Sequence, residues 1–222
     1  MISVIIPALN EEVIIGKCLR SLKHQRYSKA YEIIVADNGS TDRTVNIAKK
    51  YADKVIVEEE RGKAAAGNAG AKVAEGDMLV FVDADTVVPR NWMRTIAASM
   101  NDPVVIGGTC RVAPLKYDPK SHLVFSIYDL FVRHSIKVKE PKTWGAVIIV
   151  RKKIFDAVGG FQKRTRFEDQ DLVARIKDMG EFIMIDETLA LTSPRRVRNM
   201  GILETIKFYF IDYLTEVIRD RC

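Results

Sequence analysis

The chain has 222 residues, of which 47% are hydrophobic and 29% charged, and its Lys and Arg outnumber its Asp and Glu by 35 to 29. This describes a globular protein with one large α/β domain, or one domain with a small appendage, that needs no disulfide staples. The net charge of +6 indicates anionic partners. Nucleic acid is disfavoured, because no basic run interleaved with aromatic residues comes before the C-terminal quarter.

Targeting signals and cysteine patterns also limit the class of protein. Residues 1–6 lack a basic leader and run into Pro7, so no signal peptide is expected. No apolar stretch approaches the ~20 residues that span a bilayer. Cys18, Cys110 and Cys222 lie far apart without the paired spacing of zinc sites. Free thiols in a reducing cytoplasm are therefore expected.

In the first half of the chain, short runs rich in Val and Ile alternate with helical patterns. Runs typical of buried strands, apolar without alternation, are Ile2–Ile6, Glu32–Ala36, Lys54–Val57, Met78–Val82 and Val104–Ile106. Helical patterns cover Glu11–Lys23, Asp42–Tyr51, Ala64–Ala74 and Asn91–Met100, several after capping residues such as Asn10, Ser40 or Thr41. This order predicts an α/β fold, doubly wound, whose mostly parallel central sheet carries helices on both faces.

After about Pro114 the rhythm changes. The sequence predicts a helix from His122 to about Val138, a strand over Ala146–Val150, a turn at Gly159-Gly160, a helix from near Glu168 and a strand over Phe182–Ile185. There is no internal repeat, low-complexity segment or linker. We expect a single domain over residues 1–198, with nucleotide-type winding first, over 1–113, and a variable second half, over 114–198.

Two carboxylates, Asp83 and Asp85, stand where the apolar run 78–82 ends. If the strand continues through them, both leave the same face, at the edge where open α/β sheets bind ligands. Two such oxygen donors can hold Mg²⁺ or Mn²⁺, which keeps its other positions for water and nucleotide phosphates. The alternative is an acidic turn that caps the next helix, and the motif alone does not decide between them.

Polar residues also follow the first two predicted strands, in segments 7–12 and 36–42. Because these strand ends converge, their polar groups and helix N-termini can form one nucleotide crevice. Each segment has another account, since Asn10 is a good helix cap and Asn38-Gly39-Ser40 is ordinary turn chemistry. Asp37 directly ends an apolar strand, where its carboxylate can accept a hydrogen bond from a base or ribose.

Taken together, these segments resemble family 2 glycosyltransferases, which are inverting nucleotide-sugar enzymes with a GT-A fold. The resemblance covers roughly residues 2–198. It rests on the order of segments 4–11, 36–42, 62–77, 83–85 and 168–169. It implies that residues 1–113 form the nucleotide-binding half and residues 114–198 the acceptor-binding half.

The resemblance assigns nucleotide-binding residues. The nucleoside pocket would be lined by Pro7, Ala8, Asn10 and Glu11. Asp37 would bond the base, which is most often uracil. Asn68 and Gly70 match a segment that often reads Ala-Arg-Asn, but here Gly67 replaces the arginine, which leaves the identity of the nucleotide open. Lys63 either supplies a compensating charge or is a solvated side chain.

The resemblance also implies a divalent metal ion, Mn²⁺ or Mg²⁺, with Asp85 as the main ligand and Asp83 towards the ribose and metal. The ion and basic residues would neutralise the charge of the nucleoside diphosphate leaving group. Many relatives use a late histidine as a third ligand. The chain has His24, His122 and His134, none in that place, so water is expected there.

The catalytic base is expected at Asp169, in the segment 167–172, with Glu168 or Asp171 as the alternatives. In an inverting transfer, one carboxylate removes the proton of the acceptor hydroxyl as that oxygen attacks the anomeric carbon. A structural account of the same residues is also open. Acidic groups are favoured at a helix start, and Asp171 can pair with Arg175 four residues on.

Two further segments match the family. Trp144 and Gly145, together with Glu168, would line the sugar and acceptor site, although a core tryptophan is an alternative. Arg195 and Arg196 look like the basic loop that closes on the diphosphate in some relatives, or else are surface charge.

The expected function is an inverting, metal-dependent glycosyltransferase that moves a sugar from a nucleotide-diphospho-sugar, with a UDP-sugar favoured, to a hydroxyl of a glycan or lipid-linked acceptor. A sugar nucleotidyltransferase is disfavoured, because it would carry a glycine-rich basic loop where segment 8–12 is acidic. A non-catalytic nucleotide-sugar binder is the third reading.

Residues 199–222 predict a C-terminal amphipathic helix. Its apolar stripe comprises Ile202, Leu203, Ile206, Tyr209, Phe210, Tyr213, Leu214 and Val217. The flanking basic residues favour peripheral contact with anionic lipid, and a homodimer contact or a plain core helix is the alternative. The expected localisation is cytoplasmic, at the inner face of the membrane.

Overall fold

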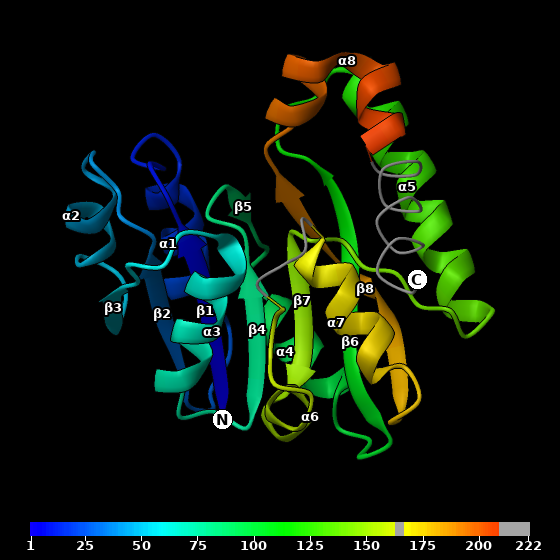
Figure 1. Cartoon of the computed structure of the whole chain (residues 1–222), viewed down its shortest axis with the longest axis horizontal. Helices are drawn as coiled ribbons and strands as arrows, with labels where there is room; N and C mark the ends of the chain where they lie inside the picture. The colour runs from blue at the N-terminus through cyan, green and yellow to red at the C-terminus, as the bar shows by residue number, and fades with distance from the viewer. Residues whose placement is uncertain (163–166, 209–222) are drawn as a thin grey trace.

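The structure, a computed structural model, describes residues 1–162 and 167–208 (Figure 1). Within those ranges one eight-stranded sheet has the order β3-β2-β1-β4-β7-β6-β8-β5. The strands are β1 (Ile2–Ala8), β2 (Tyr31–Asp37), β3 (Lys54–Val57), β4 (Met78–Val82), β5 (Thr86–Val87), β6 (Val105–Pro114), β7 (Val147–Arg151) and β8 (Glu181–Thr192). The helices are α1 (Ile15–Lys23), α2 (Thr44–Ala48), α3 (Lys63–Val73), α4 (Trp92–Ser99), α5 (Pro119–Lys137), α6 (Lys152–Ala157), α7 (Glu168–Ile176) and α8 (Arg195–Lys207).

The sheet is parallel where the chain alternates strand and helix. β3, β2, β1 and β4 pair in parallel, and so do β6 and β8. β7 enters between β4 and β6 and runs antiparallel to both, while β5 is antiparallel to β8. The predicted α/β fold with a doubly wound, mostly parallel sheet is therefore confirmed, and the strands of both halves of the chain belong to one sheet.

Helices cover both faces of this sheet (Figure 1). In β1, the alternate residues Val4 and Ile6 pack into a core with α1, α4 and α5, whereas Ile5 packs into a second core with α3, α6 and α7. All three side chains are buried. The apolar, non-alternating strands of the sequence are thus explained by burial on both faces.

The predicted starts of the first two helices were wrong. α1 begins at Ile15 rather than Glu11, and Asn10 is no cap but takes a left-handed φ of 54°. The Glu11 N–H donates to Thr44 Oγ1 at 2.8 Å, and the Asn10 side chain accepts from the Thr41 N–H at 2.8 Å. These groups therefore join two loops at the sheet edge instead of starting a helix.

The second helix covers only Thr44–Ala48 of the predicted Asp42–Tyr51. Its first turn is bonded by the Asp42 carboxylate, which accepts from the Thr44 N–H at 2.9 Å, and not by Ser40 or Thr41. In β8, the predicted end at Ile185 was also too early. The pairing with β6 resumes at Leu189 after a bulge over 186–188, where charged side chains interrupt the apolar pattern.

The chain after β8 forms α8, which starts at Arg195, four residues before the predicted C-terminal helix, and is interrupted at Gly201, where φ is 81°. Residues 209–222 of that prediction lie outside the described residues. In the parts of the chain that the structure describes, none of the helices has the length and apolarity to cross a bilayer. Cys18 and Cys110 are free and buried, as expected.

Candidate functional site

A cavity of about 350 Å³ opens at the carboxyl end of β4. Its walls come from α3, the turn after β4, α5, the segment before β7, the start of α7 and the segment that enters α8. Eight predicted site residues line it, namely Asp83, Asp85, Trp144, Gly145, Glu168, Asp169, Arg195 and Arg196. The cavity therefore gathers residues that lie more than a hundred positions apart in the chain.

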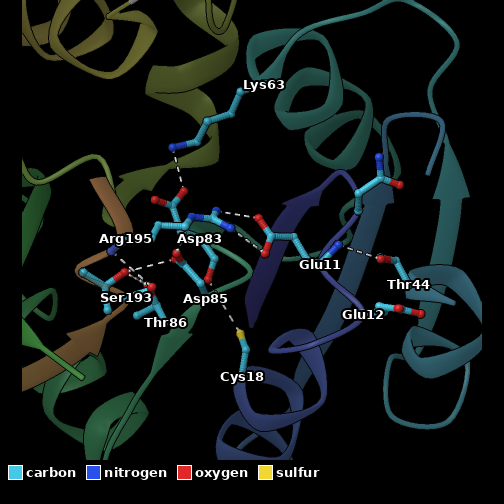
Figure 2. Close-up of polar contacts among 12 residues, drawn as sticks. Glu11, Glu12, Cys18, Thr44, Lys63, Asp83, Asp85, Thr86, Ser193 and Arg195 are labelled. Atoms are coloured by element: carbon cyan, nitrogen blue, oxygen red, sulfur yellow. Dashed lines mark hydrogen bonds and ion pairs between the residues drawn. The ribbon is translucent and has the colours of Figure 1, made fainter. Parts of the chain in front are cut away.

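The two carboxylates after β4 are presented by a turn. The prediction that both carboxylates leave the same face needed the strand to continue through them, but β4 ends at Val82. In the turn that follows, the Thr86 N–H donates to the Asp83 carbonyl at 3.0 Å. The Cys18 thiol donates to the same carbonyl at 3.7 Å (Figure 2). The Asp83 carboxylate accepts from Lys63 Nζ at 2.6 Å.

Asp85 lies deeper, with only 5% of its surface exposed. Its Oδ1 accepts from Thr192 Oγ1 at 3.0 Å, and its Oδ2 lies 3.2 Å from Arg195 Nε. The same guanidinium makes two bonds to the Glu11 carboxylate, at 2.8 and 2.5 Å, so Arg195 bridges Glu11 and Asp85 (Figure 2). Burial, reinforced by the charge of Asp83, raises the pKa of Asp85 to about 6.

Glu168 and Asp169 open α7 on the other side of Lys63. Lys63 Nζ lies 3.9 Å from Glu168 Oε1 and donates to the Gly145 carbonyl at 3.1 Å. Burial raises the pKa of Glu168 to about 7 against the opposing pull of Lys63, and it raises the pKa of Asp169 as well. For Lys63, the neighbouring carboxylates outweigh burial and hold its pKa above the ordinary value.

Gly145 fits this site because it lacks a side chain. A Cβ there would lie 2.6 Å from Asp169 Oδ2, well inside the normal contact distance. Asp169 therefore rests directly against the backbone before β7, within the cavity.

The ends of β1 and β2 form a separate polar cluster beside the cavity. Asp37 Oδ2 accepts from the N–H groups of Gly39 and Ser40, at 3.1 and 2.9 Å, while its buried Oδ1 has no partner among the described residues. Asn38 accepts from the Gly62 N–H at 2.7 Å and so fixes the start of α3. Pro7, Ala8, Asn10, Glu11 and Asp37 are not among the residues that line the 350 Å³ cavity.

Asn68 is also outside the cavity. Its side chain donates to the Phe161 carbonyl and accepts from the Phe161 N–H, both at 2.9 Å. At the preceding residue, a Cβ on Gly67 would lie 2.9 Å from the Phe161 ring. Phe161 thus occupies the space that an arginine at position 67 would need. Lys63 is the cation of α3 that reaches the site instead.

The other end of the cavity is aromatic. Trp144 is 4% exposed and packs against the rings of Phe125 and Tyr128, with centroids 5.2 and 4.6 Å away, so it belongs both to the core and to the cavity wall. The Arg196 guanidinium lies over the ring of Phe208, 4.6 Å from its centroid.

Several lining residues were not expected from the sequence. The sequence leaves the role of Lys63 open, although a cation directly before Ala64-Ala65-Ala66 is a usable signal. Phe125, Tyr128 and Phe131 recur every three residues on α5, as a lining face does. Gln170 gave no signal in the sequence.

The residues present fit a divalent ion held by two carboxylates. Asp83 and Asp85 supply hard oxygen donors, and each already has a cationic side chain against it, so the pair draws positive charge. In the described ranges, no group of three or more His, Cys, Asp and Glu gathers that could enclose an ion. Any remaining positions would belong to water and phosphate oxygens.

Comparison with known proteins shows which family and which proteins the chain is similar to. The family model described as glycosyl transferase family 2 matches residues 3–159, more than half of the chain. Glycosyltransferase AglE of Haloferax volcanii is 31% identical over 172 residues, which are 72% of this chain and 55% of that protein. The poly(ribitol-phosphate) beta-N-acetylglucosaminyltransferase TarS of Staphylococcus aureus is 33% identical over 107 residues, 45% of this chain and 19% of that protein.

Solved structures share the fold. The mannosyltransferase PcManGT from Pyrobaculum calidifontis, in complex with GDP-Man and Mn²⁺, superposes with a TM-score of 0.71 and 23% identity over 91% of this chain and 61% of that one. Residues 1–349 of S. aureus TarS in complex with UDP give 0.68 and 23% over 87% and 61%. The expected GT-A-type architecture is confirmed. The chain spans about half to three fifths of the length of AglE and of these two solved chains.

Proposed function

The chain belongs to glycosyl transferase family 2, and on that premise we propose that its cavity binds a nucleotide-diphospho-sugar and transfers the sugar to an acceptor hydroxyl. The observation that carries this proposal is the meeting of Asp83, Asp85 and Asp169 with the cations Lys63 and Arg195 around one cavity. Retention of a base candidate beside the carboxylate pair favours an enzyme over a non-catalytic binder.

The donor would lie with its base at the ends of β1 and β2 and its diphosphate against Asp83 and Asp85. The unpartnered Oδ1 of Asp37 suits a hydrogen bond from a base N–H, beside Pro7, Ala8 and Asn10. Asp85 and Asp83 would hold Mn²⁺ or Mg²⁺, which when bound neutralises negative charge on the diphosphate. Glu11, which bonds Arg195, would keep that guanidinium within reach of the diphosphate.

The cations stabilise the leaving group. Lys63 and Arg195 neutralise the two aspartates in the structure. With those aspartates engaged by a metal ion, Arg195 and Arg196 would turn to the diphosphate oxygens. Charge that develops on the departing diphosphate is then met by groups already at the site.

Asp169 would act as the base. Its carboxylate accepts the proton of the acceptor hydroxyl while that oxygen forms the new bond to the anomeric carbon, and the bond from that carbon to the diphosphate oxygen breaks. Attack from the face opposite the leaving group inverts the anomeric centre. Because burial raises the pKa of Asp169, the carboxylate is a better proton acceptor than an exposed aspartate.

The relatives support a choice of donor, and the lining of the cavity supports a choice of acceptor. TarS has been solved with UDP and PcManGT with GDP-Man, and we favour a UDP-sugar. The acceptor would approach past Gly145 and Glu168 along the aromatic wall of Trp144, Phe125 and Tyr128. Rings of this kind suit a glycan face or the apolar part of a lipid-linked acceptor.

We keep residues 1–198 as one catalytic domain followed by a C-terminal amphipathic helix. Basic residues around that helix favour peripheral contact at the cytoplasmic face of a membrane, with a homodimer as the other reading. Flotation with anionic liposomes tests this. Binding by the intact chain and its loss after truncation at Asn199 would support membrane contact, and equal binding by both would remove it.

A thermal-shift panel tests the donor proposal. UDP-glucose, UDP-N-acetylglucosamine, GDP-mannose and dTDP-glucose are each added with and without Mn²⁺. Since a ligand of the native state raises the melting temperature, we expect a rise with one nucleobase that is larger with Mn²⁺ than without. No rise with any of the four, with or without the ion, would contradict a nucleotide-sugar site.

A further inference from the structure

We infer that Gln170 is a positioning residue that fixes the first turn of α7, and with it Asp169, against the segment 143–145. The catalytic part of this inference rests on the proposed function, since it takes Asp169 as the base. The geometric part stands on the contacts of Gln170 alone.

Gln170 is 5% exposed, and every hydrogen-bonding group of its side chain is engaged. Its Nε2 donates to the Thr143 carbonyl at 2.8 Å and to the Tyr128 hydroxyl at 3.1 Å, and its Oε1 accepts from the Thr143 N–H at 3.3 Å. The Tyr128 hydroxyl in turn donates to the Thr143 carbonyl at 3.2 Å. Three residues from α7, α5 and the segment before β7 thus form one closed network.

This network lies next to the second point where α7 meets the same segment. Asp169 follows Glu168 in the first turn of α7, and a Cβ on Gly145 would lie 2.6 Å from Asp169 Oδ2. Adjacent residues of α7 therefore contact positions only two apart before β7. Asp169 against Gly145 and Gln170 against Thr143 form a clamp with two contact points.

Both contacts of the clamp are needed to define where the carboxylate sits. The short approach at Gly145 limits Asp169 only from one side, because nothing in that contact is a bond. The paired bonds of Gln170 with the Thr143 N–H and carbonyl fix both distance and orientation, as a backbone pair does. An apolar side chain of the same length would fill the space, but only Tyr128 would still bond the Thr143 carbonyl, and the Thr143 N–H would lose its acceptor.

The placement of Asp169 by Gln170 should affect the rate of sugar transfer more than the binding of the donor. The donor would contact the carboxylates after β4 and the ends of β1 and β2, none of which touches Gln170. A displaced base instead lengthens the proton transfer, and a misplacement of about 1 Å can cost about 100-fold in rate. Loss of the clamp should therefore lower kcat while the donor KM stays near its original value.

The test uses Gln170→Met, which keeps length and apolar volume but removes the bonds, and Tyr128→Phe, which removes one hydroxyl. Ser3→Ala is the matched control. Ser3 is fully buried, donates to Glu32 and accepts from the Gly76 N–H, and lies near the start of strand β1, away from the cavity.

The first readout is independent of activity. Gly145→Ala should lower the stability of the fold, because its Cβ crowds Asp169. This loss of stability should be smaller when the first turn of α7 is free to shift. In denaturant unfolding, we expect the double variant to lose less stability than the sum of the losses of Gly145→Ala and Gln170→Met, as coupled neighbours do. The losses of stability in Gly145→Ala and Ser3→Ala should instead add up in the variant that carries both. Additivity in the Gln170 cycle would overturn the clamp.

The second readout is release of UDP from UDP-glucose with Mn²⁺, measured alongside Asp169→Asn. We expect Gln170→Met to lower kcat by about 10-fold or more, with KM changed by less than about 2-fold, Tyr128→Phe to do so more weakly, and Ser3→Ala to leave both unchanged. Normal kcat in Gln170→Met beside a slow Asp169→Asn would overturn the catalytic part. Equal rates in the wild type and Asp169→Asn would instead contradict Asp169 as the base, and the unfolding cycle would still decide the clamp.

Discussion

Arg195 makes contacts that a surface arginine would not. It holds the Glu11 carboxylate with two bonds and lies 3.2 Å from Asp85, so one cation joins two carboxylates. Under the proposed function, a metal ion at Asp85 Oδ2 would compete with Arg195 for that oxygen, because Oδ1 is already bonded to Thr192. The free energy of metal binding would then include the cost of moving Arg195.

From this competition we predict opposite effects of Arg195→Gln on two ligands. Mn²⁺ alone should bind more tightly, by roughly 2- to 5-fold, because a partly exposed ion pair worth up to about 1 kcal/mol no longer opposes it. Mn²⁺ with UDP-glucose should bind less tightly, because a diphosphate contact is lost. Free Mn²⁺ is measured by electron paramagnetic resonance. Arg94→Gln, an exposed arginine on α4, controls for net charge, and equal Mn²⁺ affinity in both variants would refute the competition.

Glu168 gives a prediction for pH. Burial raises its pKa from 4.5 to about 7 in the folded chain, so between those values the folded state binds more protons than the unfolded state. Stability from this group is therefore present below about pH 4.5 and is lost as the pH rises towards about 7.

Glu168→Gln removes this titration, so its melting temperature should fall less than that of the wild type between about pH 5 and pH 8. Differential scanning calorimetry across that range is the measurement. Parallel curves for the two proteins would mean that Glu168 ionises normally in the fold.

The site residues differ in how far the sequence predicted them. Asp83, Asp85 and Asp169 follow recognisable segments, and they do line the cavity. Gln170 was not predictable, because its role depends on a backbone 27 residues away. The role of Lys63 was ambiguous in the sequence for a similar reason. Only the fold shows that the Phe161 ring fills the space that a side chain at position 67 would need.

At the scale of elements, the approach of α3 to the segment after α6 is set by glycine. A Cβ on Gly67 would lie 2.9 and 3.0 Å from two carbons of the Phe161 ring. That ring also packs against Phe81 and Phe155, with centroids 4.7 and 5.2 Å away, and cannot retreat without disturbing both.

Gly67→Ala should therefore destabilise the fold by about 1–3 kcal/mol, the usual cost of overpacking. Gly16→Ala is the matched control, since Gly16 also lies in a helix but its Cβ would meet Ile47 at an ordinary 3.4 Å. That substitution should be neutral or stabilising by up to about 1 kcal/mol. Urea unfolding of both variants decides the matter, and similar stabilities would argue against a tight contact at Phe161.

Elements with a regular apolar pattern were predicted well, and those set by tertiary contacts were not. Strands β3 and β4 match the predicted residues, because their runs are apolar throughout. Helix α1 starts at Ile15, and the Glu11 N–H before it bonds Thr44 at the start of α2, a tertiary contact that the sequence pattern does not show. The end of β8 was missed because the bulge over 186–188 breaks the pattern while the strand continues.

At the scale of the whole molecule, one sheet joins the two halves and brings the segment after β8 to the turn after β4. β5 pairs Thr86 with Thr192, so the entry to α8 lies beside Asp85. The turn after β4 and the start of α7 thus face one cavity from two parts of the chain. This arrangement leads to separate predictions for binding and for chemistry.

For chemistry, Asp169→Asn should bind UDP-glucose nearly as the wild type does but release UDP about 100-fold more slowly or worse, the usual scale for loss of a general base. Asp171→Asn is the matched control, because Asp171 lies in the same turn and pairs with Arg175 at 2.7 Å. It should change the rate much less. The reverse ranking would assign the base to the wrong carboxylate.

The central claim is that the cavity binds a nucleotide-sugar through a divalent ion at Asp85. Calorimetric titration of UDP-glucose into the wild type, Asp85→Asn and the exposed control Asp178→Asn, each with and without Mn²⁺, tests it most directly. The account predicts that Mn²⁺ strengthens binding to the wild type and to Asp178→Asn and has little effect on Asp85→Asn. Equal strengthening by Mn²⁺ in Asp85→Asn would contradict it.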